Sequence, residues 1–197
     1  MITDINQLDF NKKYTYADYL TWQFQERVEL LKGRVFEMSP APNRRHQQLS
    51  WKLTLKIGNF LDQKKCEAYS APFDVRLPLP EHKVKKDKIE TVVQPDICVI
   101  CDEYKLDEQG CVGAPDLVVE ILSAGNSRRE LKDKFELYEN AGVLEYWIVE
   151  PYKEYITVYL LNEDGAFVGS KPLLDGMFLK STVLEGFELD VSKFFEE

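Results

Sequence analysis

The sequence predicts a single α/β or α+β domain in which helices flank one mixed β-sheet. Residues 114–123 form a run of branched apolar side chains between turn-forming residues, which is typical of a central strand covered on both faces. Residues 92–101 and 145–150 have the same character. Helical periodicity occurs at 44–63 and 128–141. This order of elements predicts a layered α/β architecture.

The length and composition limit the domain organisation and the class of function. With 197 residues, 44% of them hydrophobic, the chain can bury one core, so we expect one domain over residues 1–197. Its core should span about 44–151, between a helix and hairpin at 14–40 and β-decoration at 152–197. The net charge of -9 argues against a protein that coats nucleic acid, because such binding depends on Lys and Arg.

The N-terminal segments alternate aromatic, charged and turn-forming residues. Residues 14–25 predict a short aromatic helix, and 27–38 predict a hairpin that turns at Lys32 and Gly33, with Glu29 and Glu37 on its two arms. The helix at 44–63 has one apolar stripe, with His46 on its edge, formed by Leu49, Leu53, Ile57 and Phe60.

The remaining elements follow the same reasoning. Residues 66–79 predict a strand, 81–88 a charged loop, and 92–101 a buried strand with Asp96 at its entry beside Pro95. The helix at 128–141 should end before Gly142, and Lys134 borders its apolar face. After the strand at 145–150 we expect a hairpin around 164–165 and a short strand or cap at 184–191.

The four cysteines and the absence of long apolar stretches lead to an expectation about location. The N-terminus has no apolar signal core, and no stretch approaches about 18 apolar residues, so we expect a cytoplasmic protein without membrane contact. Cys98 and Cys101 have CxxC spacing, but Cys66 and Cys111 do not form a second such pair. We therefore expect the cysteines to be reduced and to pack as small buried hydrophobic residues, as in a protein of a reducing compartment.

Glu120 is a carboxylate inside the central apolar strand. A buried carboxylate is costly, so it should be protonated, paired or bound to a metal. Because side chains alternate along a strand, Asp116 shares its face.

An ordered series of phrases along residues 14–195 resembles a known family. The phrases are 28–33 (VELLKG), 39–42 (SPAP) followed by His46, 93–96 (VQPD), 113–123 (GAPDLVVEILS), Lys134 with Tyr138, 141–143 (AGV), and 145–147 (EYW). Together they resemble the Uma-type family of restriction endonucleases, formerly a domain of unknown function, in the PD-(D/E)XK nuclease superfamily.

The resemblance implies a restriction-endonuclease-like core and a DNA endonuclease that requires Mg²⁺, with Mn²⁺ as a possible substitute. Asp96 and Glu120 would be the metal ligands, which suits Mg²⁺ because it binds one or two carboxylates and keeps several waters. The superfamily usually places its lysine two residues after the acid, where this chain has Leu122. In Uma-type sequences a lysine on the next helix replaces it, and Lys134 occupies that position, so the resemblance implies that Asp96, Glu120 and Lys134 are catalytic.

Other residues have both a functional and a structural interpretation. Asp116 fits strand entry better than metal binding, and His46 fits a structural hydrogen bond as well as a contact to phosphate or bound water. Either Glu29 or Glu37 would supply a further acid, and the sequence does not choose between them. A weak set of phosphate contacts, equally readable as a charged surface, comprises Arg128, Arg129 and Lys132.

The functional alternatives are an endonuclease, a non-cleaving module that binds nucleic acid or another partner, and a metalloenzyme for a small phosphate ester. The acidic charge favours the second, whereas the intact acids favour the first. The resemblance also implies a homodimer, whose two sites would cut both strands. Two departures from the family pattern concern the loop near the site: Ser-Ala-Gly at 123–125 replaces Ser-Pro-Ser, and Glu130 replaces an aspartate.

Overall fold

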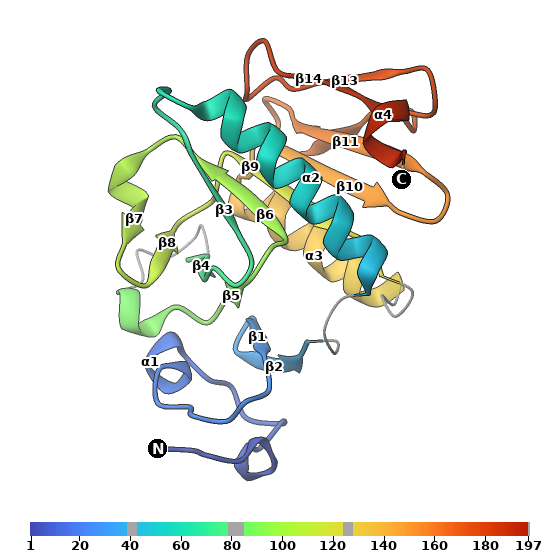
Figure 1. Ribbon diagram of the computed structural model, residues 1–197. Helices are drawn as coiled ribbons and strands as arrows, with labels where there is room; N and C mark the ends of the chain where they lie inside the picture. The colour runs from blue at the N-terminus through green and yellow to red at the C-terminus, as the bar shows by residue number, and fades with distance from the viewer. Residues whose placement is uncertain (39–42, 79–84, 124–127, 197) are drawn as a thin grey trace.

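The computed structural model describes residues 1–38, 43–78, 85–123 and 128–196, and it leaves out the side chains of residues 128–130. The first sheet has six strands (Figure 1). In spatial order they are β12 (Phe167–Gly169), β11 (Tyr155–Leu161), β10 (Glu145–Glu150), β9 (Leu117–Ile121), β6 (Ile97–Ile100) and β3 (Glu67–Ser70). The expected central strand is therefore central, because β9 lies between a parallel neighbour, β10, and an antiparallel one, β6.

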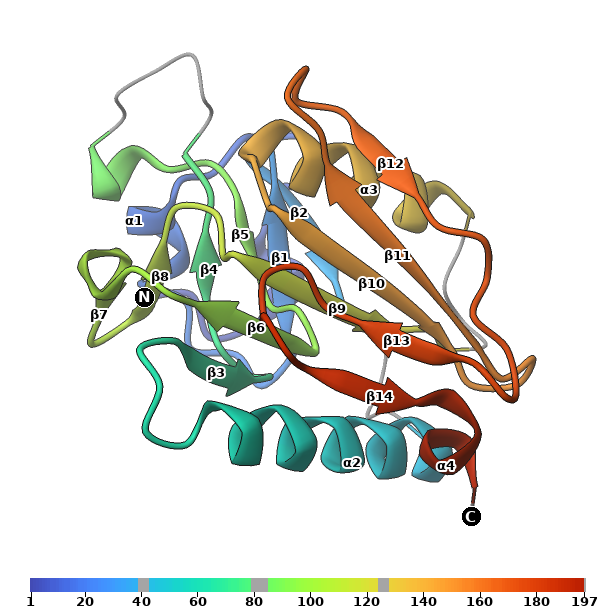
Figure 2. The ribbon, with the colours of Figure 1, turned by 90° about the horizontal axis from the view of Figure 1, so that it is seen from above.

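Helices cover the two faces of this sheet. Figure 2 shows α2 (Arg44–Leu61) on one side and α3 (Arg128–Ala141) on the other. The apolar stripe of α2 packs on the first face together with β13 (Phe178–Lys180), β14 (Glu188–Asp190) and α4 (Val191–Phe195). The connection from β9 through α3 to the parallel strand β10 is a βαβ crossover, which places α3 on the second face.

A second six-stranded sheet corrects the expectation of one sheet. Its order is β2 (Arg34–Glu37), β1 (Val28–Leu31), β5 (Val92–Val93), β4 (Val75–Arg76), β8 (Gly110–Val112) and β7 (Leu106–Asp107). The N-terminal hairpin is thus one edge of this sheet. β7 and β8, which the sequence did not suggest, form the other edge.

Two expected long strands are each divided between the sheets. The chain leaves β3 of the first sheet and enters β4 of the second after a cis peptide bond between Ala71 and Pro72. It returns from β5 to β6 through residues 94–96. The backbone amide of Ala71 donates to the carbonyl oxygen of Asp96 at 3.1 Å, so the two crossings lie side by side.

The other predicted elements compare as follows. The hairpins at Lys32 and Gly33 and at 164–165, together with both long helices, are confirmed. The helix expected over 14–25 is reduced to α1 (Tyr16–Tyr19), because the aromatic residues after it pack as a cluster instead of continuing the helix. The remaining short elements are the 3₁₀ helices η1 (Ile5–Gln7), η2 (Lys86–Lys88) and η3 (Glu103–Lys105).

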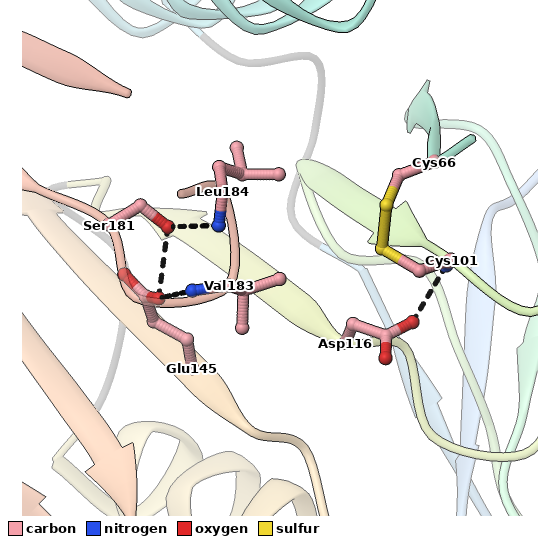
Figure 3. Close-up of a disulfide and its surroundings, with 7 residues drawn as sticks. All are labelled: Cys66, Cys101, Asp116, Glu145, Ser181, Val183 and Leu184. Atoms are coloured by element: carbon pink, nitrogen blue, oxygen red, sulfur yellow. Dashed lines mark hydrogen bonds between the residues drawn. A yellow bond between two sulfur atoms is a disulfide. The ribbon is translucent and has the colours of Figure 1, made fainter. Parts of the chain in front are cut away.

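Cys101 contradicts the expectation that it is a buried thiol, because it forms a disulfide with Cys66 (Figure 3). β3 pairs with β6 in a register that places Glu67 opposite Ile100, so the residues just beyond them are also opposite. Cys98 faces the other side of the strand and remains a free, buried cysteine, as expected. Within the described residues, the helices lack the combination of length and hydropathy that a membrane span needs.

Candidate active site

The candidate site lies where the chain passes between the two sheets. Ile97 pairs with Val119 across the antiparallel strands β6 and β9. Continuing that register by one residue places Asp96 opposite Glu120. Glu29 reaches the same place from β1, because Leu30 pairs with Val92 just before the crossing. The amide of Gln94 donates to Glu29 Oε1 at 2.9 Å and fixes that carboxylate.

Lys134 joins two of these acids. Its Nζ lies 3.0 Å from Glu120 Oε1 and 3.2 Å from Glu29 Oε1, and the residue is only 7% exposed. Burial by itself lowers the pKa of Lys134, but the two carboxylates raise it above its ordinary value. Lys134 is therefore an ammonium that neutralises a crowded acidic site.

Glu120 is held in an environment that opposes its charge. The pKa of Glu120 is raised to about 7, because burial, together with the neighbouring Asp96 and Glu29, raises it by more than Lys134 and the Tyr138 hydroxyl lower it. The Tyr138 hydroxyl donates to Glu120 Oε1 at 2.7 Å. Because Lys134 and Tyr138 are four residues apart on α3, both side chains reach the same oxygen.

Asp96 is anchored on one oxygen. Its Oδ2 accepts the backbone N–H of Ile121 at 2.8 Å and lies 3.2 Å from His46 Nε2. His46 sits in the first turn of α2, which Asn43 caps by accepting the His46 amide at 2.9 Å. Burial lowers the pKa of His46, but the hydrogen bond and charge of Asp96, together with the nearby Glu120, outweigh it, so the net direction is upward.

The structure brings most of the predicted site residues together and leaves Glu37 outside the site. Asp96, Glu120, Lys134, Glu29 and His46 are brought together. Glu37 is exposed on the other arm of the hairpin, where it pairs with Val28 rather than with Glu29.

Three further assignments follow. Asp116 lies at the opposite end of β9, where its Oδ2 accepts the Cys101 amide at 2.7 Å, which is a strand-entry role (Figure 3). Lys132 is exposed and pairs with Glu136 at 3.5 Å. The side chains of Arg128 and Arg129 lie outside the described residues.

No functional role was predicted for Tyr138, the Gln94 amide or the Ile121 amide. The spacing of Tyr138 from Lys134 carried a signal, since residues four apart share a helix face. The two backbone amides carried none, because a backbone donor is independent of residue type.

The donor set suits a hard divalent cation. The hydrogen bonds from described residues use Oδ2 of Asp96 and Oε1 of Glu120, so the other oxygen of each accepts no bond from these residues. Mg²⁺ needs only one or two carboxylates when water and phosphate complete its shell. Among the described residues, no three or more His, Cys, Asp or Glu side chains are placed so that together they could hold a metal ion. A metal held by Asp96 and Glu120 would therefore need water and substrate as its remaining ligands.

Comparisons with known proteins agree with this fold. A family model described as "Uma2: Putative restriction endonuclease" matches residues 16–192. An uncharacterised protein, slr1290, of Synechocystis sp. is 26% identical over 183 residues, which is 91% of this chain and 90% of that protein. A crystal structure from Anabaena variabilis, titled a putative nuclease belonging to DUF820, superposes with a TM-score of 0.70 at 16% identity and covers 92% of this chain and 97% of that one. The chain belongs to the Uma2 family.

Proposed function

We propose that the protein is a Mg²⁺-dependent endonuclease that hydrolyses phosphodiester bonds of DNA. The observation that carries the proposal is the convergence of Glu120 and Glu29 on the buried ammonium of Lys134, with the Asp96 carboxylate near enough to raise the pKa of Glu120. So many acids at one junction are costly for folding alone, whereas strongly perturbed groups cluster at functional sites.

The residues have distinct roles in this proposal. Asp96 and Glu120 hold the metal through the oxygens that accept no bond from the described residues. A bound Mg²⁺ would lower the pKa of a water ligand and polarise the scissile phosphate. Of the three N–H donors of Lys134, two are directed to Glu120 and Glu29, and the third is available to orient the attacking water or to stabilise developing negative charge.

His46 and Tyr138 position these groups. His46 holds Asp96 Oδ2, and Tyr138 holds Glu120 Oε1, so each carboxylate keeps one defined oxygen for the metal. Outer partners of this kind fix the orientation of ligands and their basicity.

The first test is cleavage of supercoiled plasmid and a branched oligonucleotide in Mg²⁺, Mn²⁺ or EDTA, with Glu120→Ala purified in parallel. We expect metal-dependent nicking that the variant lacks. Equal nicking by both preparations would indicate a contaminating nuclease and contradict the assignment. Calorimetric titration with Mn²⁺ adds a readout without turnover, in which Asp96→Ala and Glu120→Ala should lose the metal.

The two acids of the N-terminal hairpin supply a matched pair of variants. Glu29→Gln removes a partner of Lys134 and should reduce cleavage, whereas Glu37→Gln makes the same charge change at an exposed position and should not. Equal effects of the two variants would show that general charge, rather than the junction, controls activity.

A non-cleaving module that keeps the nuclease fold and binds nucleic acid or another partner is the second candidate, and the net charge of -9 favours it over the nuclease. Filter binding separates the candidates, because affinity for DNA without cleavage in any metal would support the module. We further propose a homodimer, whose two sites would act on both strands. Light scattering that gives only a monomer at micromolar concentration would contradict the dimer.

A further inference from the structure

A second concave site lies beside the candidate active site. It is a cavity of about 520 Å³, and its walls come from both crossings between the sheets and from the β7–β8 hairpin. Its lining includes Tyr69, Phe73, Asp74, Gln94, Asp107 and Glu108. A cavity of this volume is in the range of small-ligand sites.

The cavity has a flat apolar wall. The rings of Tyr69 and Phe73 are stacked, with centroids 4.1 Å apart and planes inclined by 12°. Both residues line the cavity and are only half-buried, so part of each side chain is open to a ligand. Exposed aromatic faces of this kind accept planar heterocycles by stacking.

The polar group in the cavity is a fixed hydrogen-bond acceptor. Arg27 Nη2 donates to Gln94 Oε1 at 2.6 Å, which turns the Gln94 amide nitrogen toward Asp74. Gln94 Nε2 and the Tyr19 hydroxyl then donate to Asp74 Oδ1, at 2.8 and 3.3 Å. Oδ2 of Asp74 accepts no bond from the described residues, so an incoming N–H group has a defined partner.

The charge of the cavity selects against a phosphate inside it. Asp107 is paired with Arg76 and, at 2.9 Å, with Lys86. Asp74 and Glu108 therefore leave the cavity acidic. Burial raises the pKa of Asp74, and the hydrogen bonds from Gln94 and Tyr19 oppose that rise. A ligand that presents N–H donors and a flat ring, with any phosphate kept outside, complements these walls.

The position of the cavity connects it with the active site. Gln94 precedes Asp96 by two residues, which corresponds to about 7 Å of extended chain. On the other crossing, Ala71 bonds to Asp96 two residues before Phe73. A nucleotide whose phosphate lies at Asp96 and Glu120 therefore has its neighbouring base within reach of the cavity.

We propose that this cavity binds an unstacked nucleobase with N–H donors on its Watson–Crick edge, and guanine best. The stacked rings contact the face of the base, and Asp74 accepts from the N1–H and N2–H groups of guanine. Thymine presents carbonyl oxygens beside its single N–H, and those oxygens would face the carboxylate. Unpaired bases are recognised by this combination of stacking and edge contacts.

The proposal deepens the nuclease assignment, but its test does not depend on cleavage. The protein in EDTA is titrated with 2′-deoxyguanosine and with thymidine, and binding is followed by NMR. We expect 2′-deoxyguanosine to bind at least about tenfold more tightly, with shifts in the ring signals of Tyr69 and Phe73. Asp74→Asn should bring the affinity ratio close to one, and Glu103→Gln, a charge-matched change at an exposed residue outside the cavity lining, should preserve it.

Phe73→Leu supplies a second variant, which should weaken both nucleosides and keep their ratio. Equal binding of the two nucleosides by the unmodified protein would overturn the proposal, as would a preference that survives in Asp74→Asn. Tighter binding of an arginine amide would identify a peptide cation as the ligand and would also overturn it. A guanine preference without cleavage in any metal would retain the cavity and reject the nuclease, whereas cleavage without the preference would reject the cavity alone.

Discussion

Glu120 and Glu145 are acids on two adjacent parallel strands, β9 and β10, yet they have opposite surroundings. Glu145 is fully buried and accepts four neutral donors: the Trp147 indole, the Ser181 hydroxyl and the amides of Thr182 and Val183. Figure 3 shows its carboxylate directed at the C-terminal segment. Glu120 faces the other side of the sheet, where it meets two further acids, one ammonium and one hydroxyl.

From this difference we infer that Glu145 is a structural carboxylate and that Glu120 is the candidate for a functional one. Neutral donors stabilise the charge of Glu145 without leaving an oxygen exposed to another ligand, so the residue fastens the chain at 181–184 to β10. Glu120 is opposed by like charges, and only one of its oxygens accepts a bond from the residues that the structure describes. Burial alone does not mark a carboxylate as a candidate active-site acid, whereas burial among other acids does.

The largest expected difference between the two acids is in catalysis. Glu120→Gln removes a proposed metal ligand and should lower metal-dependent cleavage by more than about 100-fold, beyond the usual loss from an outer partner. Glu145→Gln makes the same chemical change on the other face and should retain cleavage within about twofold, once the folded fraction is corrected for. Plasmid nicking rates check this, and a comparable loss in both variants would remove the distinction.

The stability of the same variants should show the reverse order. At pH 5, Glu145→Gln places an amide NH₂ group among four donors, and we expect the free energy of unfolding to fall by about 3 kcal/mol. At that pH Glu120 is protonated, so Glu120→Gln should change it by less than about 1 kcal/mol. Urea denaturation measures both values. A larger loss for Glu120→Gln would show that Glu120 is the structural acid.

Prediction from the sequence succeeded where the signal was local. The periodicity of α2 and α3 and the apolar run of β9 each lie within one segment, so the helices and central strand were predicted correctly. Asp96, Glu120 and Lys134 were selected by resemblance, and the structure brings them together. Whether they are catalytic stays a prediction.

The parts that were missed depend on non-local pairing. Residues 92–101 are apolar on both sides of Gln94, Pro95 and Asp96, so the two apolar parts do not show that β5 pairs with β1 and β4 while β6 pairs with β9. That division brings Glu29 into the site and leaves Glu37 out. The disulfide between Cys66 and Cys101 joins residues 35 apart, and it depends on the β3–β6 register rather than on CxxC spacing.

The next largest expected difference between Glu120 and Glu145 is in how the free energy of unfolding depends on pH. The pKa of Glu120 is raised to about 7, so between about pH 4.5 and 7 the folded protein binds a proton that the unfolded chain has released. Stability from this group is therefore present at low pH and is lost as pH rises through 7. The loss is about 1.4 kcal/mol per pH unit and roughly 3 kcal/mol in total.

Comparison with Glu120→Gln isolates this contribution. In metal-free buffer, the unmodified protein should lose stability relative to the variant as pH rises from 5 to 8. Urea denaturation at four or five pH values measures the difference. A difference that stays constant, or that changes in the opposite direction, would contradict the raised pKa.

The smallest expected effect concerns the hydroxyl that supports Glu120. The 2.7 Å hydrogen bond from Tyr138 to Oε1 lowers the pKa of Glu120. Tyr138→Phe removes this bond, so the pKa of Glu120 should rise further. A neutral hydrogen bond contributes about 1 kcal/mol, which corresponds to a shift of about 0.7 pH unit. The midpoint of Mn²⁺ binding against pH should therefore move upward by about that amount, because the metal binds the ionised carboxylate.

Tyr146→Phe is the matched control, because its ring lies 5.1 Å from that of Tyr138 and its buried hydroxyl has no partner among the described residues. That variant should leave the midpoint in place. If Tyr138→Phe also left it unchanged, the hydroxyl would not control the charge of Glu120. Glu120 would then be set apart from Glu145 by its charged neighbours alone.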